Sequence, residues 1–163
     1  MMNKKIYAVD LVLIVGSLIG LILLGSYARP LVIAPINDYE TSKPILFSIE
    51  KADRIIIDDN LEFSSPDEFN AEEGLTINLK PGVYFWKAVS NVGLKSDVRK
   101  LTINSEIDLR LRKADKGYDI INAGNVNLNV DIYNGTRLID SISVLSGGEE
   151  NAEGNKFVGV ENE

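Results

Sequence analysis

Residues 11–28 read LVLIVGSLIGLILLGSYA and contain no charged side chain. With residues 6–9 added, the apolar stretch covers 23 positions, and only Asp10 interrupts it. At about 1.5 Å per residue, a helix of this length approaches the roughly 30 Å hydrocarbon core of a bilayer. Lipid cannot satisfy unpaired backbone groups, so a spanning segment of this kind has to be helical. The sequence therefore predicts a transmembrane helix over residues 6–28, in contact with membrane lipid.

The charges beside this helix predict its orientation. Lys4 and Lys5 precede it, and Arg29 is the one basic residue close behind it. An excess of positive charge favours the cytoplasmic side, and Tyr27 stands at the far end, where aromatic rings favour the interface. We therefore predict a single-pass cell membrane protein in which residues 1–5 are cytoplasmic and the region after the helix is extracytoplasmic.

A cleaved signal peptide is the competing interpretation. Ser26 and Ala28 are small residues that suit cleavage after Ala28. The apolar stretch is longer than the 7–15 residues usual for a signal core, which favours a retained anchor. Ser26 also stands where a lipoprotein signal carries its acylated cysteine, so no lipid can be attached there.

Gly16 and Gly20 form a GxxxG pattern within the predicted helix. Two glycines one turn apart expose a flat backbone patch on which a second helix can pack. They are candidate helix-packing residues for a homo-oligomer, although glycine is common in membrane helices in general.

An apolar N-terminal helix before a β-rich head also resembles the type IV pilin subunits. Members of that family carry an acidic residue at the fifth mature position. Cleavage after Lys5 would place Asp10 there, but Lys5 itself stands where the family has Gly or Ala. A structural subunit of a surface filament is therefore the alternative role.

The chain has no cysteine and no histidine. These absences exclude disulfides, thiolate catalysis and a Ser-His-Asp triad, and they remove the commonest metal ligand. No motif singles out a pair of carboxylates for glycoside hydrolysis. We therefore expect no enzyme, with no catalytic residue, no cofactor and no metal.

The net charge of the chain is −7. Setting aside residues 1–28, which carry Lys4, Lys5 and Asp10, leaves 15 basic and 23 acidic residues, a net charge of −8. A domain this acidic repels phosphate backbones, which argues against nucleic acid as a partner. The same charge argues against a basic surface that docks on anionic lipid.

Beyond a Pro-punctuated linker at residues 29–37, short β-type runs alternate with turn residues. The runs are residues 45–49, 54–57, 75–79, 83–89 and 98–103. A spacing of about ten residues is typical of an all-β sandwich. Alternation along the fourth run places Tyr84, Trp86 and Ala88 on one face, and we expect Trp86 in the core.

Residues 79–88, LKPGVYFWKA, resemble the corner that leads into the penultimate strand of fibronectin type III-like domains. Residues 52–55 and 63–66 also resemble exported members of that family. The resemblance covers residues 38–104 and implies a fibronectin type III-like β-sandwich there.

Residues 105–163 are predicted to form a smaller β unit with an acidic tail. Val126, Leu128, Val130 and Ile132 alternate with polar residues, and a type I′ turn is expected at Asn134-Gly135 before a return strand over residues 138–145. Residues 121–126 and the hairpin after them are similar to small immunoglobulin-like modules. Whether the two β units share one core stays open.

Three polar features are weaker candidates. Asn134-Gly135-Thr136 fits a glycosylation sequon, so Asn134 is a candidate acceptor. Residues 58–73 contain seven carboxylates and no Lys or Arg, a pattern that suits either Ca²⁺ or solvated loops. Arg110 and Arg112 fall on one strand face and suit either a docking strip for acidic partners or glycans, or a solvated face.

Together these features predict an N-terminal transmembrane helix followed by an all-β exported region. The expected role is a membrane-anchored, non-catalytic cell-envelope protein. Its β-sandwich modules would bind an envelope protein or glycan, or act as an envelope scaffold.

Overall fold

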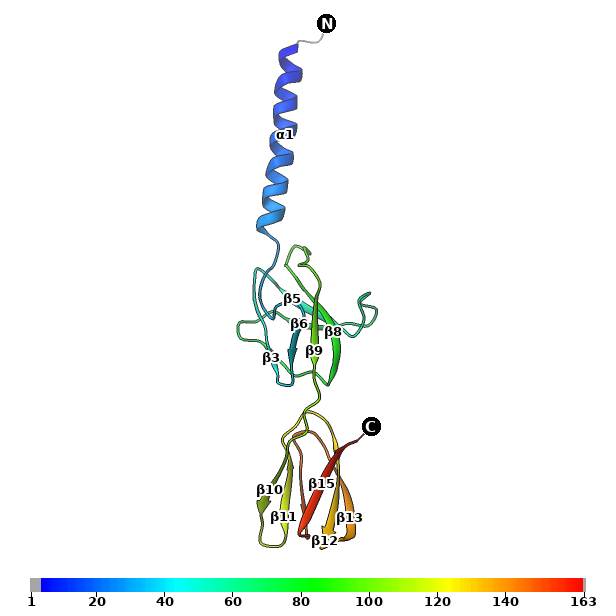
Figure 1. Ribbon diagram of the computed structural model, residues 1–163. Coiled ribbons are helices and arrows are strands. Elements are labelled where there is room, and N and C mark those ends of the chain that lie inside the picture. Colours follow the sequence, from blue (N-terminus) through cyan, green and yellow to red (C-terminus); the bar gives the residue numbers. More distant parts are fainter. Residues whose placement is uncertain (1–3, 163) are drawn as a thin grey trace. The chain divides into compact units, whose positions relative to one another are not determined.

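The computed structural model describes residues 4–162, and the side chains at 4–6, 8, 24 and 26 are left out of that description (Figure 1). The described residues form one helix and fifteen strands, so this part of the chain is mostly β, as the sequence predicts. The predicted cytoplasmic segment 1–5 lies outside the described residues, apart from the backbone of Lys4 and Lys5.

The helix α1 spans Lys4–Tyr27. Its interior has no proline, and its leucines are good helix formers, whereas its valines, isoleucines and glycines are weaker ones. Pro30 follows three residues after its end, where a proline commonly stops a helix. Over the residues whose side chains are described, no helix is long and apolar enough to cross a membrane.

Short strands make up the rest of the described chain. Their bounds are β1 (Leu31–Ala34), β2 (Tyr39–Thr41), β3 (Ile45–Leu46), β4 (Ser48–Glu50), β5 (Arg54–Asp58), β6 (Asp67–Asn70), β7 (Thr76–Ile77), β8 (Gly82–Val89), β9 (Arg99–Ile103), β10 (Leu109–Lys113), β11 (Tyr118–Asn122), β12 (Leu128–Asn134), β13 (Arg137–Val144), β14 (Glu149–Ala152) and β15 (Lys156–Glu161). They form sheets of two, three or five strands.

Contacts divide the chain into two compact units, and each is discontinuous in sequence. Within the described residues, unit 1 holds residues 4–37, 46–75 and 84–100. Unit 2 holds residues 38–45, 76–83 and 101–162.

The largest sheet has the order β2-β9-β8-β5-β6. Strand β5 is antiparallel to both β6 and β8, whereas β2 runs parallel to β9. Trp86 on β8 is fully buried, which confirms its predicted place in the core. Its ring meets the ring of Phe47 edge to face, with centroids 4.9 Å apart. Such pairs stabilise a core beyond the area that they bury.

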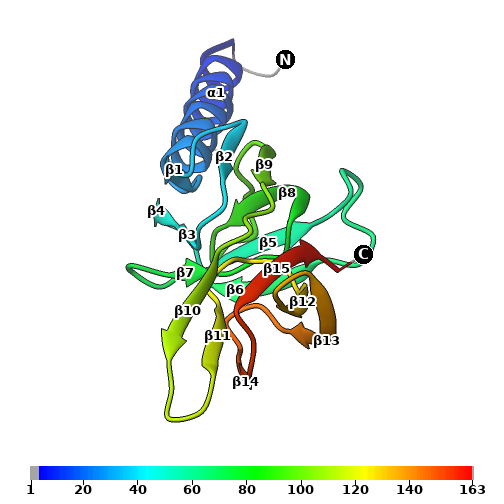
Figure 2. The same ribbon diagram turned by 60° about the horizontal axis from the view of Figure 1, so that its bottom comes forward.

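Unit 2 contains two three-stranded sheets, β10-β11-β14 and β13-β12-β15. Figure 2 shows β14 beside β11, to which it is antiparallel. Both sheets contribute to one core, which includes Ile120, Leu128, Val130, Ile132 and Val144. The predicted alternation along β12 is confirmed, because its apolar residues are buried and its polar residues are not.

The hairpin turn after β12 is shifted by one residue from its prediction. Asn134 pairs with Arg137, so the two central residues are Gly135 and Thr136. Only Gly135 has a positive φ, of 65°. A glycine at the first central position is the pattern of a type II′ turn, and the predicted type I′ turn at Asn134-Gly135 is wrong. A register shift between Ile132 and Tyr133 accompanies the difference.

Three strands lie in segments predicted as linker, loop or tail. Strand β1 occupies the linker and pairs with β4, and β6 lies within the acidic run and pairs with β5. Strand β14 occupies the acidic tail and pairs with β11. Each of these strands is held by backbone hydrogen bonds to its partner strand and buries few of its own side chains. Its sequence therefore needs no strong alternation of apolar and polar residues.

Candidate functional site

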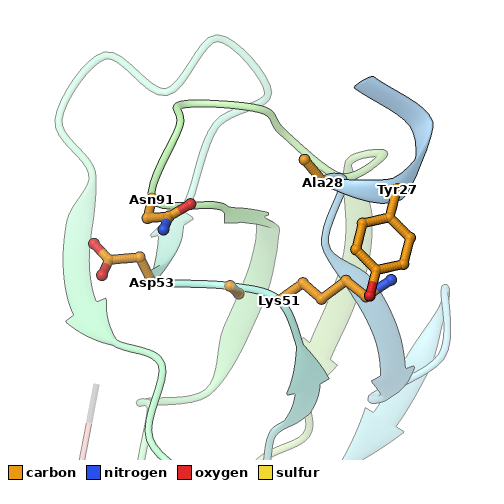
Figure 3. Close-up of a pocket in the computed structure, with 6 residues that line it drawn as sticks. Tyr27, Ala28, Lys51, Asp53 and Asn91 are labelled. Carbon is orange, nitrogen blue, oxygen red and sulfur yellow. The ribbon is translucent and has the colours of Figure 1, made fainter. Parts of the chain in front are cut away.

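The end of α1 adjoins a hollow in the surface of unit 1. The hollow has a volume of about 400 Å³ and is lined by Tyr27, Ala28, Lys51, Ala52, Asp53 and Asn91. These residues come from the last turn of α1 and the residue after it, from the turn between β4 and β5, and from the loop after β8. Figure 3 shows Lys51 extended toward the Tyr27 ring, with Asp53 and Asn91 elsewhere around the hollow.

Lys51 is placed by a tight turn. Its φ is +58°, which lets the chain reverse between β4 and β5. Asp53 then continues into the sheet, because its backbone N–H donates to Val89 O at 2.8 Å and its carbonyl accepts from Ala71 N at 2.9 Å. The Lys51 ammonium lies 4.0 Å from the centroid of the Tyr27 ring. This is a cation–π contact between the turn after β4 and the end of the helix.

A second hollow lies where the chain leaves α1. Its volume is about 220 Å³, and its lining residues are Arg29, Pro30, Leu31, Val32, Lys95, Ser96, Asp97 and Arg99. Arg99 has a structural role, because its guanidinium donates hydrogen bonds to two backbone carbonyls, Pro35 O at 2.8 Å and Val32 O at 3.2 Å. We call the residues that line these two hollows the helix-proximal surface.

The helix-proximal surface combines cations, an amide and a phenol ring. Arg29, Lys51 and Lys95 are exposed, as are Asp53 and Asp97. Such groups hold anions and polar head groups by charge and hydrogen bonding. This mixture of charged and hydrogen-bonding groups supports binding of a polar or charged ligand.

A groove within unit 2 is lined by carboxamides. Its volume is about 590 Å³, and its lining includes Asn78, Asn125, Asn127 and Asn162 together with Lys80 and Glu161. Some of these amides are held in place: Asn125 Nδ2 donates to Asn104 O at 2.9 Å, and Asn127 Oδ1 accepts from Ser146 N at 3.0 Å. Positioned amides of this kind can present donors and acceptors to a polar ligand.

The acidic run contains a buried carboxylate with a structural role. Asp58 is 5% exposed, and its oxygens accept hydrogen bonds from Asn60 N and Ser65 N at 3.1 and 3.0 Å. Burial alone would raise the pKa of Asp58, but these hydrogen bonds, led by that from Ser65, outweigh it and hold the pKa below its usual value. Over the described residues, no group of three or more acidic, histidine or cysteine side chains could hold a metal ion.

The arginines of β10 are paired locally. Arg110 Nη2 lies 2.6 Å from Asp108 Oδ2, and Arg112 Nη2 lies 3.0 Å from Asp119 Oδ2 and also bridges to Glu149. The hydrogen bond from Arg110 lowers the pKa of Asp108. The charge of this strip is therefore largely balanced by its own neighbours.

The candidate residues of the sequence belong to different units, Gly16 and Gly20 to unit 1 and Asn134 to unit 2. In the described part of α1, nothing lies within 4 Å of a Cβ built on Gly16 or Gly20, so neither glycine is needed for a contact inside the chain. Asn134 is exposed at the end of β12, where its Oδ1 accepts from Asn155 Nδ2 at 3.3 Å.

The helix-proximal surface contains residues that the sequence did not single out. Tyr27 was predicted at the interface, but Lys51, Asn91 and Lys95 belong to loops with no motif. A weak signal was present in residues 90–94, SNVGL, because Asn and Gly are common in tight turns.

Comparisons of the chain with protein-family models, with curated proteins and with solved structures find no match.

Proposed function

We propose that this chain is a membrane-anchored, non-catalytic cell-envelope protein in which α1 spans the membrane and the β units are displayed outside the cell. The observation that carries this proposal is the surface of α1. From Leu11 to Val15, five consecutive apolar side chains are between 46% and 70% exposed.

Consecutive residues of a helix point about 100° apart, so five of them face every direction around its axis. A helix that is apolar on all sides is not stable in water by itself. Within the described residues these five side chains have no partner that buries them, so we infer a partner outside this part of the chain. A lipid bilayer supplies one, because the backbone polar groups are already satisfied within the helix.

The proposed orientation keeps the N-terminus in the cytoplasm. Lys4 and Lys5 precede the apolar residues, and the positive-inside rule favours that side for them. The β units then face outward as a fibronectin type III-like and a smaller immunoglobulin-like module. The carboxamide-lined groove of unit 2 supports binding of a glycan or an envelope protein, because its amides offer both donors and acceptors.

A single-cysteine experiment tests the topology, because the natural chain has no cysteine. Thr136→Cys places a thiol at the turn between β12 and β13. We expect it to react with a membrane-impermeant maleimide in intact cells, and the protein to stay in the membrane pellet at alkaline pH. Protection of Thr136→Cys until the cells are lysed would contradict the proposed orientation, and full release at alkaline pH would contradict the anchor.

A filament subunit is the second candidate, favoured by the same exposed apolar surface. In a filament, helices of neighbouring subunits would cover one another's apolar side chains, and Asp10, which is exposed on α1, would need a partner there. Purification of sheared surface filaments tests this role. Recovery of the chain in the filaments with Ile6 as its first residue would replace the anchor with the filament role.

Self-association through the GxxxG pattern can be tested with a matched control. Gly16, Gly20 and Gly25 all have open space around an added Cβ within the described chain. We expect Gly20→Leu to weaken helix dimers in detergent micelles, measured by energy transfer between labelled copies, and Gly25→Leu to leave them unchanged. Equal transfer in both variants would place any helix contact away from Gly20.

A further inference from the structure

The loop after β8 carries an apolar side chain at its tip. Val92 is 65% exposed. Asn91, just before it, lines the same hollow as Tyr27, and Lys95, shortly after it, lines the same hollow as Arg29. Both ends of this loop are therefore next to the segment in which α1 ends.

Backbone hydrogen bonds define the conformation of the loop. Ser90 N donates to Leu94 O at 2.8 Å, and Gly93 N donates to Ser90 O at 2.9 Å. Gly93 has a φ of +82°. This is a three-residue hairpin loop, in which a turn is followed by a left-handed residue. A third hydrogen bond, from Leu94 N to Ser90 Oγ at 3.1 Å, supports it. The fold thus holds Val92 at the tip, away from the core.

The charges around this tip differ from those of the whole chain. The chain as a whole carries a net charge of −7. The exposed charged residues of the helix-proximal surface are instead three cations, Arg29, Lys51 and Lys95, and two anions, Asp53 and Asp97. Lys51 is further tied to the helix by its contact with Tyr27. Basic side chains beside an apolar tip are the combination that favours the head-group region of a bilayer.

We propose that the loop of residues 91–93 docks on the membrane that holds α1, with Val92 in the interface and Lys51 and Lys95 beside lipid phosphates. This inference rests on the proposed membrane anchor. If Tyr27 stands at the head-group level, Lys51 stands there too, because its ammonium is 4.0 Å from the ring. Asn91 shares that hollow, so Val92 is held at the same level. The docked loop gives the sandwich a second point of attachment and fixes its tilt on the membrane.

A second exposed apolar residue of unit 1 supplies a matched control. Leu61 is 62% exposed and lies in the loop between β5 and β6. That loop follows the end of β5, whereas Lys51 and Asp53 precede its start, so Leu61 is at the opposite end of the strand from the helix-proximal surface. It lines neither of the two hollows.

The test uses the full chain in vesicles of phosphatidylcholine and phosphatidylglycerol. Single cysteines replace Val92, Leu61 or Leu18 and carry an environment-sensitive fluorophore, which is possible because the chain has no cysteine of its own. Nitroxide-labelled lipids report the depth of each probe. We expect head-group nitroxide to quench the Val92→Cys probe several-fold more than the Leu61→Cys probe, and nitroxide deep in the acyl chains to quench the Leu18→Cys probe.

The outcomes separate the two proposals. Deep quenching at Leu18→Cys with equal, weak quenching at Val92→Cys and Leu61→Cys overturns the docking loop and leaves the anchor in place. Weak quenching at all three positions overturns the anchor and the docking loop together.

A substitution pair supplies an independent check. With the fluorophore on Asn91→Cys, we expect Val92→Asp to remove most of the quenching and Val92→Leu to retain it. Val92 is exposed, so neither change should disturb the core, and emission from Trp86, the one tryptophan, reports that unit 1 is folded. Unchanged quenching in Val92→Asp overturns the role of Val92.

Discussion

Helix α1 and strand β12 are both rich in branched apolar residues, but their side chains have opposite surroundings. From Leu11 to Val15 every side chain of α1 is exposed, whereas Leu128, Val130 and Ile132 of β12 are buried. The strand separates its two faces with alternating polar residues, so the chain itself can cover the apolar one. The helix has no polar face. An apolar surface that a chain cannot cover indicates where it meets something else, which is the basis of the proposed anchor.

The largest expected effect comes from placing a charge on the buried face of β12. Val130→Asp leaves an unpaired charge in the core of unit 2, at a cost of at least about 3–5 kcal/mol. We expect loss of hydrogen-exchange protection along β12 in the full chain. The matched control is the next residue, which points away from the core: Asp131→Asn should change stability by less than about 0.5 kcal/mol. Equal effects of the two changes would contradict the assignment of faces.

Trp86 tests the core of unit 1 in the same way. Trp86→Ala should destabilise the protein by about 3–5 kcal/mol, measured by urea unfolding followed with circular dichroism. Within the described residues its indole N–H has no hydrogen-bond partner. Trp86→Phe removes that unsatisfied donor and keeps the edge-to-face contact with Phe47, so it should cost clearly less. A cost for Trp86→Phe equal to that of Trp86→Ala would contradict this expected order.

A charge on α1 tests the other side of the comparison. Leu18→Arg should weaken membrane retention by about 2.5–3.5 kcal/mol, because an arginine at the centre of a spanning helix is costly. The fraction of the chain in the membrane pellet after alkaline extraction measures this effect, with Leu18→Ala as the control. The β units should stay folded in both variants. Unchanged retention in Leu18→Arg would show that α1 does not lie in lipid.

The smallest effect concerns the buried carboxylate of unit 1. The pKa of Asp58 is lowered in the folded state, so its ionised form stabilises the fold above the pKa of the unfolded chain, about 3.9. This contribution is lost as the pH falls through the lower, folded pKa. Asp58→Asn should therefore lower the thermal midpoint near pH 7 and leave it almost unchanged near pH 2. Glu62→Gln, an exposed change in the same loop, is the control. A difference that persists at pH 2 would assign the effect to packing and not to charge.

Much of the candidate site depended on tertiary structure. Tyr27 could be predicted at the interface, because it ends an apolar stretch. Lys51 and Asn91 could not, since they are 40 residues apart in sequence and line one hollow only because β5 pairs with β8. The same pairing sets the place of Val92. A loop residue has no periodicity of its own, so its position follows from the strands on either side of it.

The sequence by itself determined the features that rest on local periodicity and composition. They are the helix of α1, the mostly β character of the rest, the core position of Trp86 and the buried face of β12. Only the tertiary structure decided the parallel pairing of β2 with β9, the strands β6 and β14 in acidic segments, and the turn at Gly135-Thr136. The physical reason is that alternation and apolar runs are visible along a single segment. Strand partners, bulges and the burial of a carboxylate such as Asp58 depend on hydrogen bonds from residues elsewhere in the chain.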